Sequence, residues 1–229
     1  MENKSQIVRR SFSTPTELHV RETEGADSRT ITGYAIMFGV PSAPLWKEEN
    51  SEAREVIAPG AITKELLDGQ DIKMTMFHDR QLLLARSNKG EGTLKYTVDE
   101  KGVAFEFDAP NTIDGDKALE LVRRGDISGC SFAFSTPYYD EDYVERKSEV
   151  DANGFDEITY IVKAVTGIYD FTLAIDPAYE DTSVEAREFV RTLKGVQAEE
   201  APVEDKKDEA KMLEQIREMR RIANNSLVR

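Results

Sequence analysis

Short runs in which apolar and polar residues alternate dominate the chain up to about residue 175. The clearest run covers residues 93–108, where every second position is apolar on both sides of the polar segment 99–102. Alternation with this period places the apolar side chains on one face of a strand, and a short polar segment between two such strands predicts a β-hairpin. Further strands are expected within 6–22, at 29–38, at 55–57, in the run that ends at His78, at 129–134, at 158–165 and at 168–175.

Helical signals are fewer than strand signals. Asp114 is a suitable N-cap residue, and glycines stand where helices commonly end. Because strands outnumber helices and do not alternate regularly with them, the pattern predicts an α+β protein that is mainly β, with an antiparallel or mixed β core flanked by about three helices. The helices are expected at 61–67, 116–124 and about 184–193, followed by Gly69, Gly125 and Gly195, and loops are expected at 41–50 and 141–157, the second with an exposed hairpin tip as the alternative.

The composition changes after Gly195, and this change predicts how the chain divides into domains. Residues 1–28 are expected to be an N-terminal extension with one or two strands, residues 29–195 the main domain, and residues 196–229 an acidic linker followed by a helical tail. The tail helix carries an apolar stripe at helical spacing. This stripe either packs on its own domain or binds a partner chain, including a second copy, and both interpretations stay open. The stripe consists of Met212, Ile216, Met219 and Ala223.

Charge and cysteine content exclude several classes of function. The formal net charge of -14 disfavours a surface that binds nucleic acid or anionic lipid, because such surfaces are basic. The single cysteine, Cys130, cannot form an internal disulfide, and one cysteine with two widely separated histidines matches no metal-ligand spacing. No long apolar run and no signal-peptide pattern are present in the sequence. We therefore expect no metal, no cofactor, no nucleic-acid partner and no membrane span.

Ser131 is the candidate nucleophile within the strand predicted at 129–134. Ser131 and Ala133 share one face of this strand, and the opposite face carries Cys130 and two phenylalanines, so a small hydroxyl would stand with its back to a hydrophobic wall. The alternative is that Ser131 is simply a small residue in a strand. The sequence Gly-x-Ser-x-Ala differs from the nucleophile elbow of α/β-hydrolases, because that motif needs a helix after the serine and here β-favouring aromatics and Pro137 follow.

A serine nucleophile needs a base within hydrogen-bond reach and a group that orients the base. The chain has two histidines, so there are two candidates. His78 ends a strand-like run and meets a polar turn, where its imidazole can act as a general base; the alternative is a polar turn residue paired with Asp79. His19 belongs to an alternating polar segment near the N-terminus, which is typical of a solvated face.

Three features in this order resemble the prohead proteases of tailed phages, the serine proteases of capsid maturation, which are related in fold to herpesvirus assemblin. They are a His78-Asp79 pair at the end of a strand, the later Gly-x-Ser-Phe-x-Phe strand around Ser131, and an acidic strand that ends in Pro-Ala-Tyr at 177–179. The resemblance extends from about Thr32 to Val190 and implies a closed, assemblin-like β-barrel with helices around it.

The resemblance also implies the site residues. Ser131 would be the nucleophile, His78 the base, and Asp170, seven positions before the proline of Pro-Ala-Tyr, the acidic orienter of the base. Competing orienters are Asp79, which as a neighbour of His78 on a strand would point to the opposite face, and Asp176, which sits beside the turn. Backbone N–H groups are the expected oxyanion donors, and two arginines, Arg86 and Arg146, are further candidates whose plainer interpretation is surface charge.

The function implied by the resemblance is a serine endopeptidase that cleaves capsid and scaffold proteins, and its own chain, during procapsid maturation. Its partners would be the major capsid protein with its scaffold region and a second copy of itself, and its location the assembling procapsid in the host cytoplasm. The main alternative is a non-enzymatic β-domain that acts in capsid assembly or as an interaction module, because a fold does not guarantee activity. A weaker alternative is an acidic scaffold or chaperone that works through its helical tail.

Overall fold

The structure is a computed structural model, and it describes residues 6–11, 18–21 and 28–174. The chain divides into two units, Met1–Ala186 and Arg187–Arg229, and all described residues belong to the first. The third predicted helix, the linker, the tail helix and Asp176 lie outside the described residues.

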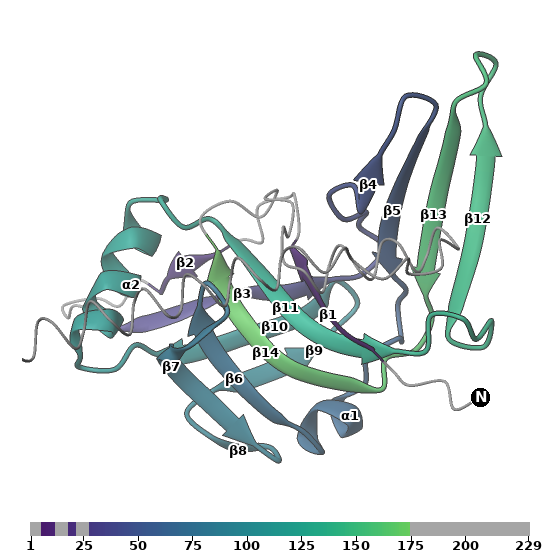
Figure 1. Ribbon diagram of the computed structural model, residues 1–229. Helices are drawn as coiled ribbons and strands as arrows, with labels where there is room; N and C mark the ends of the chain where they lie inside the picture. Colours follow the sequence, from purple (N-terminus) through teal and green to yellow (C-terminus); the bar gives the residue numbers. More distant parts are fainter. Residues whose placement is uncertain (1–5, 12–17, 22–27, 175–229) are drawn as a thin grey trace, which may run out of the picture. The chain divides into compact units, whose positions relative to one another are not determined.

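Sheet A has six strands and holds the central part of the fold (Figure 1). Its neighbouring strands pair antiparallel with one exception, the parallel pair of the third and fourth strands. Chain order and spatial order differ, so strands that are distant in sequence become neighbours. In spatial order the strands are β1 (Gln6–Ser11), β11 (Gly129–Thr136), β14 (Gly167–Ala174), β6 (Asp71–Met76), β7 (Asp79–Asn88) and β8 (Glu91–Gly92).

Sheet B is a four-stranded antiparallel sheet that contains the predicted hairpin. Asp99 closes the hairpin, because its Oδ1 accepts hydrogen bonds from the backbone N–H groups of Lys101 (2.8 Å) and Gly102 (2.9 Å). The predicted alternation is confirmed, since Phe105 and Phe107 are 2% exposed. In spatial order the strands are β2 (His19–Val20), β3 (Thr30–Met37), β10 (Gly102–Asp108) and β9 (Lys95–Val98).

The hydrophobic core forms where sheets A and B meet, with β11 against β3. Phe132 and Phe134 of β11 are fully buried, and their rings stack with centroids 5.2 Å apart. Fully burying a phenylalanine side chain stabilises a protein by about 1.5–3 kcal/mol, so this pair anchors β11 firmly. The predicted aromatic wall is present, and Ser131 and Ala133 are buried as well, so both faces of β11 are covered.

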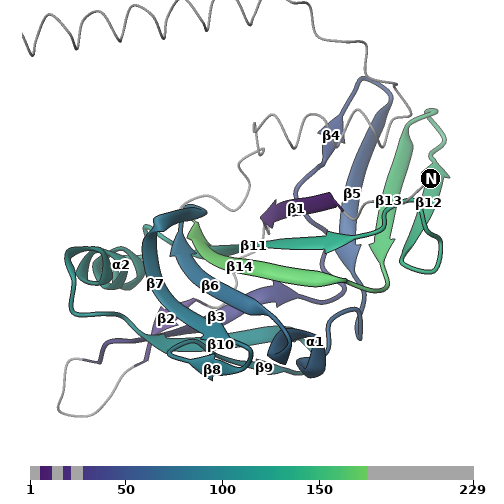
Figure 2. The ribbon, with the colours of Figure 1, turned by 60° about the horizontal axis from the view of Figure 1, so that its bottom comes forward.

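Sheet C stands away from the other two sheets in both views (Figures 1 and 2). It joins a hairpin of two long strands to the strand that precedes the first helix, through a parallel pair. The segments predicted as loops at 41–50 and 141–157 therefore contain strands, and the hairpin alternative given for 141–157 is the correct one. In spatial order the strands are β12 (Val144–Val150), β13 (Asp156–Val162), β5 (Ser51–Ile57) and β4 (Trp46–Lys47).

Two helices occur in the part of the chain that the structure describes, α1 (Lys64–Asp68) and α2 (Ile113–Arg123). Both start where a threonine caps them, Thr63 by accepting from Leu66 N and Thr112 by accepting from Gly115 N, each at 3.2 Å. The predicted start of α1, at residue 61, is too early. The predicted cap of α2 is also wrong, because Asp114 lies inside that helix. The apolar residues that α2 buries are Ala118, Leu119 and Val122.

The predicted closed barrel with about three helices is wrong. A barrel closes only when the first and last strands of one sheet pair with each other. Within residues 6–11, 18–21 and 28–174 the strands are divided among three open sheets, and β1 and β8 form the two opposite edges of sheet A. The protein is mainly β, with two helices among the described residues. In the same part of the chain, no helix is long and apolar enough to cross a membrane.

Candidate active site

The three residues predicted for the site come together in sheet A. Ser131 lies on β11, Asp170 lies on the neighbouring strand β14, and His78 lies in the short connection between β6 and β7. Because β14 pairs with β11 on one side and with β6 on the other, it is the strand that brings the three residues together. Ala133 is the partner of Asp170 in the register, so Asp170 and Ser131 lie on the same face of the sheet.

The His78 imidazole is hydrogen-bonded at both of its nitrogens. Nδ1 lies 2.8 Å from Asp170 Oδ1, and Nε2 lies 2.8 Å from Ser131 Oγ. An ionised carboxylate only accepts hydrogen bonds, so Nδ1–H donates to Asp170. Nε2 then carries the lone pair and accepts a hydrogen bond from the Ser131 hydroxyl. This tautomer is the one that a general base for a serine nucleophile requires.

The surroundings of the site favour this arrangement. The Asp170 side chain is 9% exposed and the His78 side chain 21%, while Ser131 is 1% exposed. A buried carboxylate is costly unless it has a hydrogen-bonding partner, and the imidazole N–H is that partner for Asp170. The Asp170 carboxylate therefore reaches Nδ1, with Oδ1 at 2.8 Å.

The competing candidates lie elsewhere. Asp79 is exposed at the start of β7, where its Oδ1 accepts from Gln81 N at 2.8 Å. His19 is exposed on β2, which belongs to sheet B. Arg146 is exposed on β12 in sheet C.

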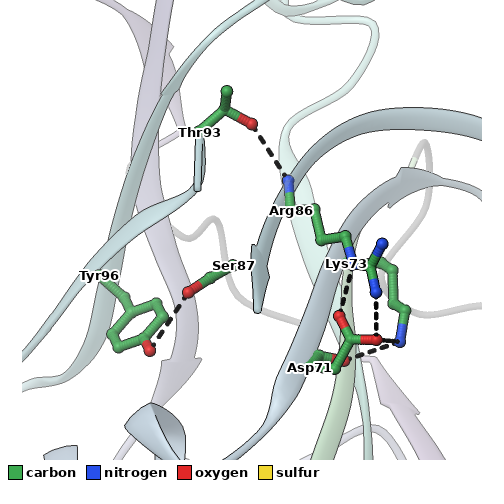
Figure 3. A network of polar contacts seen from close by, with 6 residues as sticks. All are labelled: Asp71, Lys73, Arg86, Ser87, Thr93 and Tyr96. Atoms are coloured by element: carbon green, nitrogen blue, oxygen red, sulfur yellow. Dashed lines mark hydrogen bonds and ion pairs between the residues drawn. The ribbon is translucent and has the colours of Figure 1, made fainter. Parts of the chain in front are cut away.

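Arg86 belongs to a salt bridge with Asp71, the first residue of β6, whereas His78 follows the other end of that strand. Figure 3 shows this ion pair. Its guanidinium donates two hydrogen bonds to the carboxylate of Asp71, at 2.6 and 2.7 Å, and Lys73 Nζ donates to the same carboxylate at 2.8 Å. The hydrogen bond from Arg86, and next the one from Lys73, hold the pKa of Asp71 far below its ordinary value. The Arg86 side chain is therefore part of a structural ion pair with Asp71.

Cys130 precedes Ser131 in the sequence, but it is not a second candidate nucleophile. Its side chain is fully buried, and this burial raises the pKa of the thiol to about 12. Since the thiolate is the reactive form of cysteine, Cys130 is inert at neutral pH. Among the residues that the structure describes, no group of three or more His, Cys, Asp or Glu side chains is arranged to hold a metal ion.

Sequence reasoning missed how the backbone of His78 is held. Two buried threonines, Thr172 on β14 and Thr75 on β6, form a hydrogen-bonded pair beneath it. The only sequence signal is that Thr172 shares a strand face with Asp170. The pairing of β14 with β6, which brings the two threonines together, has no local signature.

The Ser131 hydroxyl is hydrogen-bonded to His78, and His78 is hydrogen-bonded to the buried Asp170. This connectivity is that of serine hydrolases. The family model of the caudovirus prohead serine proteases matches residues 16–195, and the chain belongs to this family. A search of solved structures found the capsid assembly protease of bacteriophage T4, at 11% identity and a TM-score of 0.38, covering 72% of this chain and 98% of that one. A likeness this distant adds nothing to the assignment. A search of curated protein sequences found no match.

Proposed function

We propose that this chain is a serine endopeptidase that cleaves capsid and scaffold proteins during maturation of the phage procapsid. Ser131 is the nucleophile, His78 the general base and Asp170 the residue that orients the base. The observation that carries this proposal is the His78 imidazole, which bonds Ser131 Oγ at one nitrogen and Asp170 at the other, each at 2.8 Å. Membership of the prohead serine protease family supports the choice of substrate class.

The geometry supports acyl transfer in two steps. Ser131 Oγ attacks the carbonyl carbon of the scissile peptide while its proton moves to His78 Nε2, and the imidazolium that forms is stabilised by the Asp170 carboxylate. The tetrahedral intermediate breaks its C–N bond, and the amine leaves with the proton from Nε2, which gives an acyl-enzyme. Water, deprotonated by the same nitrogen, then attacks the acyl carbon. The C–Oγ bond breaks, the proton on Nε2 passes to Ser131 Oγ, and the free carboxyl product leaves.

The proposed partners follow from the family. Prohead proteases act on the prohead, so we place the enzyme inside the assembling procapsid in the host cytoplasm, with the major capsid protein and its scaffold region as substrates. Cleavage of its own chain and self-association are part of the same proposal.

The decisive experiment is co-expression of the protease with the capsid protein, with the mass of the capsid protein as the readout. We expect Ser131→Ala and His78→Ala each to abolish processing to the same extent, and their double variant to be no worse, because triad members act as a unit. His19→Ala is the matched control and should process normally. Undiminished processing by a folded Ser131→Ala protein would leave the non-enzymatic assembly module as the better interpretation.

A further inference from the structure

His78 lies in a left-handed backbone conformation that residues other than glycine adopt uncommonly. Phe77 and His78 form a two-residue connection between Met76 and Asp79, which pair with each other at the ends of β6 and β7. Both residues of the connection have positive φ, 57° and 56°. Tight hairpin turns of this kind favour Asn and Gly, and a left-handed conformation costs other residues about 1–2 kcal/mol each. Something outside the turn must therefore hold it.

Two hydrogen bonds from this turn to β14 meet that need. Phe77 N donates to the backbone carbonyl of Leu173 at 3.2 Å, and His78 N donates to the side-chain Oγ1 of Thr172 at 2.9 Å. The Thr172 oxygen also accepts from Thr75 Oγ1 at 3.0 Å, and the two threonines are 0% and 1% exposed. A buried hydroxyl with fixed partners is a rigid anchor, because it has no water to exchange with.

The register places this anchor within the site. Thr172 is the partner of Ser131 across β11 and β14, and of Thr75 across β14 and β6, so the three hydroxyls form one row on one face of sheet A. Asp170 stands two residues before Thr172 on the same face. Two residues on this face of β14 thus bind His78: Asp170 accepts a hydrogen bond from its ring, and Thr172 accepts one from its main chain.

We propose that Thr172 is a positioning residue for the base, with Thr75 as its support. The Thr172 hydroxyl fixes the main chain of His78 in the left-handed turn, and this sets the direction in which the imidazole leaves the backbone and points Nε2 at Ser131 Oγ. Thr75 donates to the Thr172 oxygen and so keeps the remaining lone pair of Thr172 Oγ1 directed at His78 N. Its hydrogen bond is to the main chain of His78, so Thr172 acts on the reaction through the base. This inference rests on the proposed function and adds a residue to it.

The test measures the reaction of Ser131 with a fluorophosphonate probe in the purified full-length protein. Thr172→Val keeps the shape of the side chain and removes the hydroxyl. Because the anchor acts on the geometry of the base, we expect kinact to fall about tenfold while KI stays unchanged. Thr172→Ser restores an oxygen at the same place and should recover most of the wild-type kinact. A merely structural role of Thr172 would not produce this split or this rescue.

A matched control removes another buried threonine hydroxyl of the same sheet. Thr136 on β11 is 1% exposed and donates to the backbone carbonyl of Ala164 at 2.7 Å. Thr136→Val should lower the unfolding temperature about as much as Thr172→Val and leave kinact unchanged, because its hydrogen bond does not involve His78.

Each outcome decides something. A wild-type protein that does not react with the probe would reject the proposed function and this inference with it. A reactive wild type with an equal kinact in folded Thr172→Val would reject the inference alone. If Thr172→Val does not fold, Thr75→Val decides: we expect kinact to fall severalfold, because the Thr172 oxygen loses its supporting donor, and an unchanged kinact would overturn the proposal.

Discussion

At the scale of single residues, the site depends on one imidazole whose two nitrogens have different partners. Asp170 accepts from Nδ1 and so determines which nitrogen is protonated, while Ser131 meets the other nitrogen. The roles of Asp170 Oδ1 and Ser131 Oγ differ because a carboxylate only accepts hydrogen bonds, whereas a hydroxyl also donates. Substitutions that keep the shape of a side chain and change its hydrogen-bonding capacity therefore test the site most sharply.

The first such substitution is Asp170→Asn. The amide of asparagine can donate to Nδ1, which leaves Nε2 protonated and unable to accept from Ser131, so we expect the cleavage rate to fall on the order of 10³–10⁴-fold without being abolished. Asp170→Glu should retain part of the activity, because a carboxylate still accepts from Nδ1. The measurement is the rate of capsid-protein cleavage by purified enzyme.

Asp79→Asn is the control for that series. Asp79 is exposed, and the Oδ1 of asparagine can still accept from Gln81 N, so neither the cleavage rate nor stability should change. An active Asp170→Asn beside an inactive Asp79→Asn would transfer the orienting role to Asp79.

Cys130 gives a second prediction at this scale. With its pKa raised to about 12 by burial, the thiol stays protonated at pH 8, and alkylating reagents attack the thiolate. We expect iodoacetamide to leave both Cys130 and the proteolytic activity of the folded protein untouched. The same reagent should modify Cys130 in urea, which serves as the positive control. Alkylation of Cys130 in the native protein would contradict its burial and its raised pKa.

At the scale of elements, the pair of β6 and β7 carries a pH-dependent contribution to stability. The pKa of Asp71 is lowered, first by the hydrogen bond from Arg86, so this carboxylate stabilises the fold above its unfolded pKa of about 3.9 and loses that effect as the pH falls toward the lower folded value. The Asp71 side chain is 35% exposed, so solvent screening limits the effect to roughly 0.5–1 kcal/mol. Asp71→Asn should lower the free energy of unfolding by this amount at pH 7.

Urea unfolding at several pH values tests this prediction. The difference between wild type and Asp71→Asn should shrink below about pH 4, because protonation of Asp71 removes the charge that the variant lacks. Arg86→Gln combined with Asp71→Asn completes a double-mutant cycle, and additive losses of stability would show that the two side chains do not act as a pair.

The sequence predicts elements well where a local rule decides them. The hairpin of β9 and β10 follows from alternation and from Asp99 in its turn, and the end of α1 follows from Gly69. β7 was missed because its burial does not alternate: Leu83 is 45% exposed while Leu84 and Ala85 are both buried. The three open sheets could not be predicted, because alternation identifies strands and does not show which strands pair. The expectation of a closed barrel came from the family resemblance alone.

The same distinction applies to the site. Ser131, His78 and Asp170 were predicted from a strand pattern and a family resemblance, and the structure brings them within hydrogen-bond distance. Thr172 could not be predicted, because its bond to His78 N joins residues 94 positions apart and depends on a turn with positive φ. A sequence of Phe and His gives no sign of such a turn, since Asn and Gly are its usual residues.

At the scale of the whole molecule, the tail allows a prediction that depends on composition alone. Residues 196–208 are rich in Glu, Ala and Lys and contain few large apolar residues, so the sequence predicts an accessible linker. We expect the active enzyme to cut its own chain between about Lys194 and Lys211 and to release the segment with the stripe of Met212, Ile216 and Met219. Before the cut, that stripe would pack on a helix of the scaffold or capsid protein.

Intact-mass analysis of the purified protein tests the tail prediction. A shortened C-terminus in the active protein, and a full-length one in Ser131→Ala, would confirm it. A full-length C-terminus in both, under conditions in which the capsid protein is cut, would reject it.

The position of β14 also has a consequence for when the enzyme becomes active. β14 lies between the strand of Ser131 and the strand that leads to His78, and in chain order it follows every other strand that the structure describes. The site contacts span 53 and 92 residues of sequence, and contacts at such separation form slowly. A nascent chain that has not yet reached Asp170 carries a serine and a histidine that no strand has brought together. We therefore expect proteolysis to begin only after β14 has been synthesised and has inserted between β11 and β6 of sheet A.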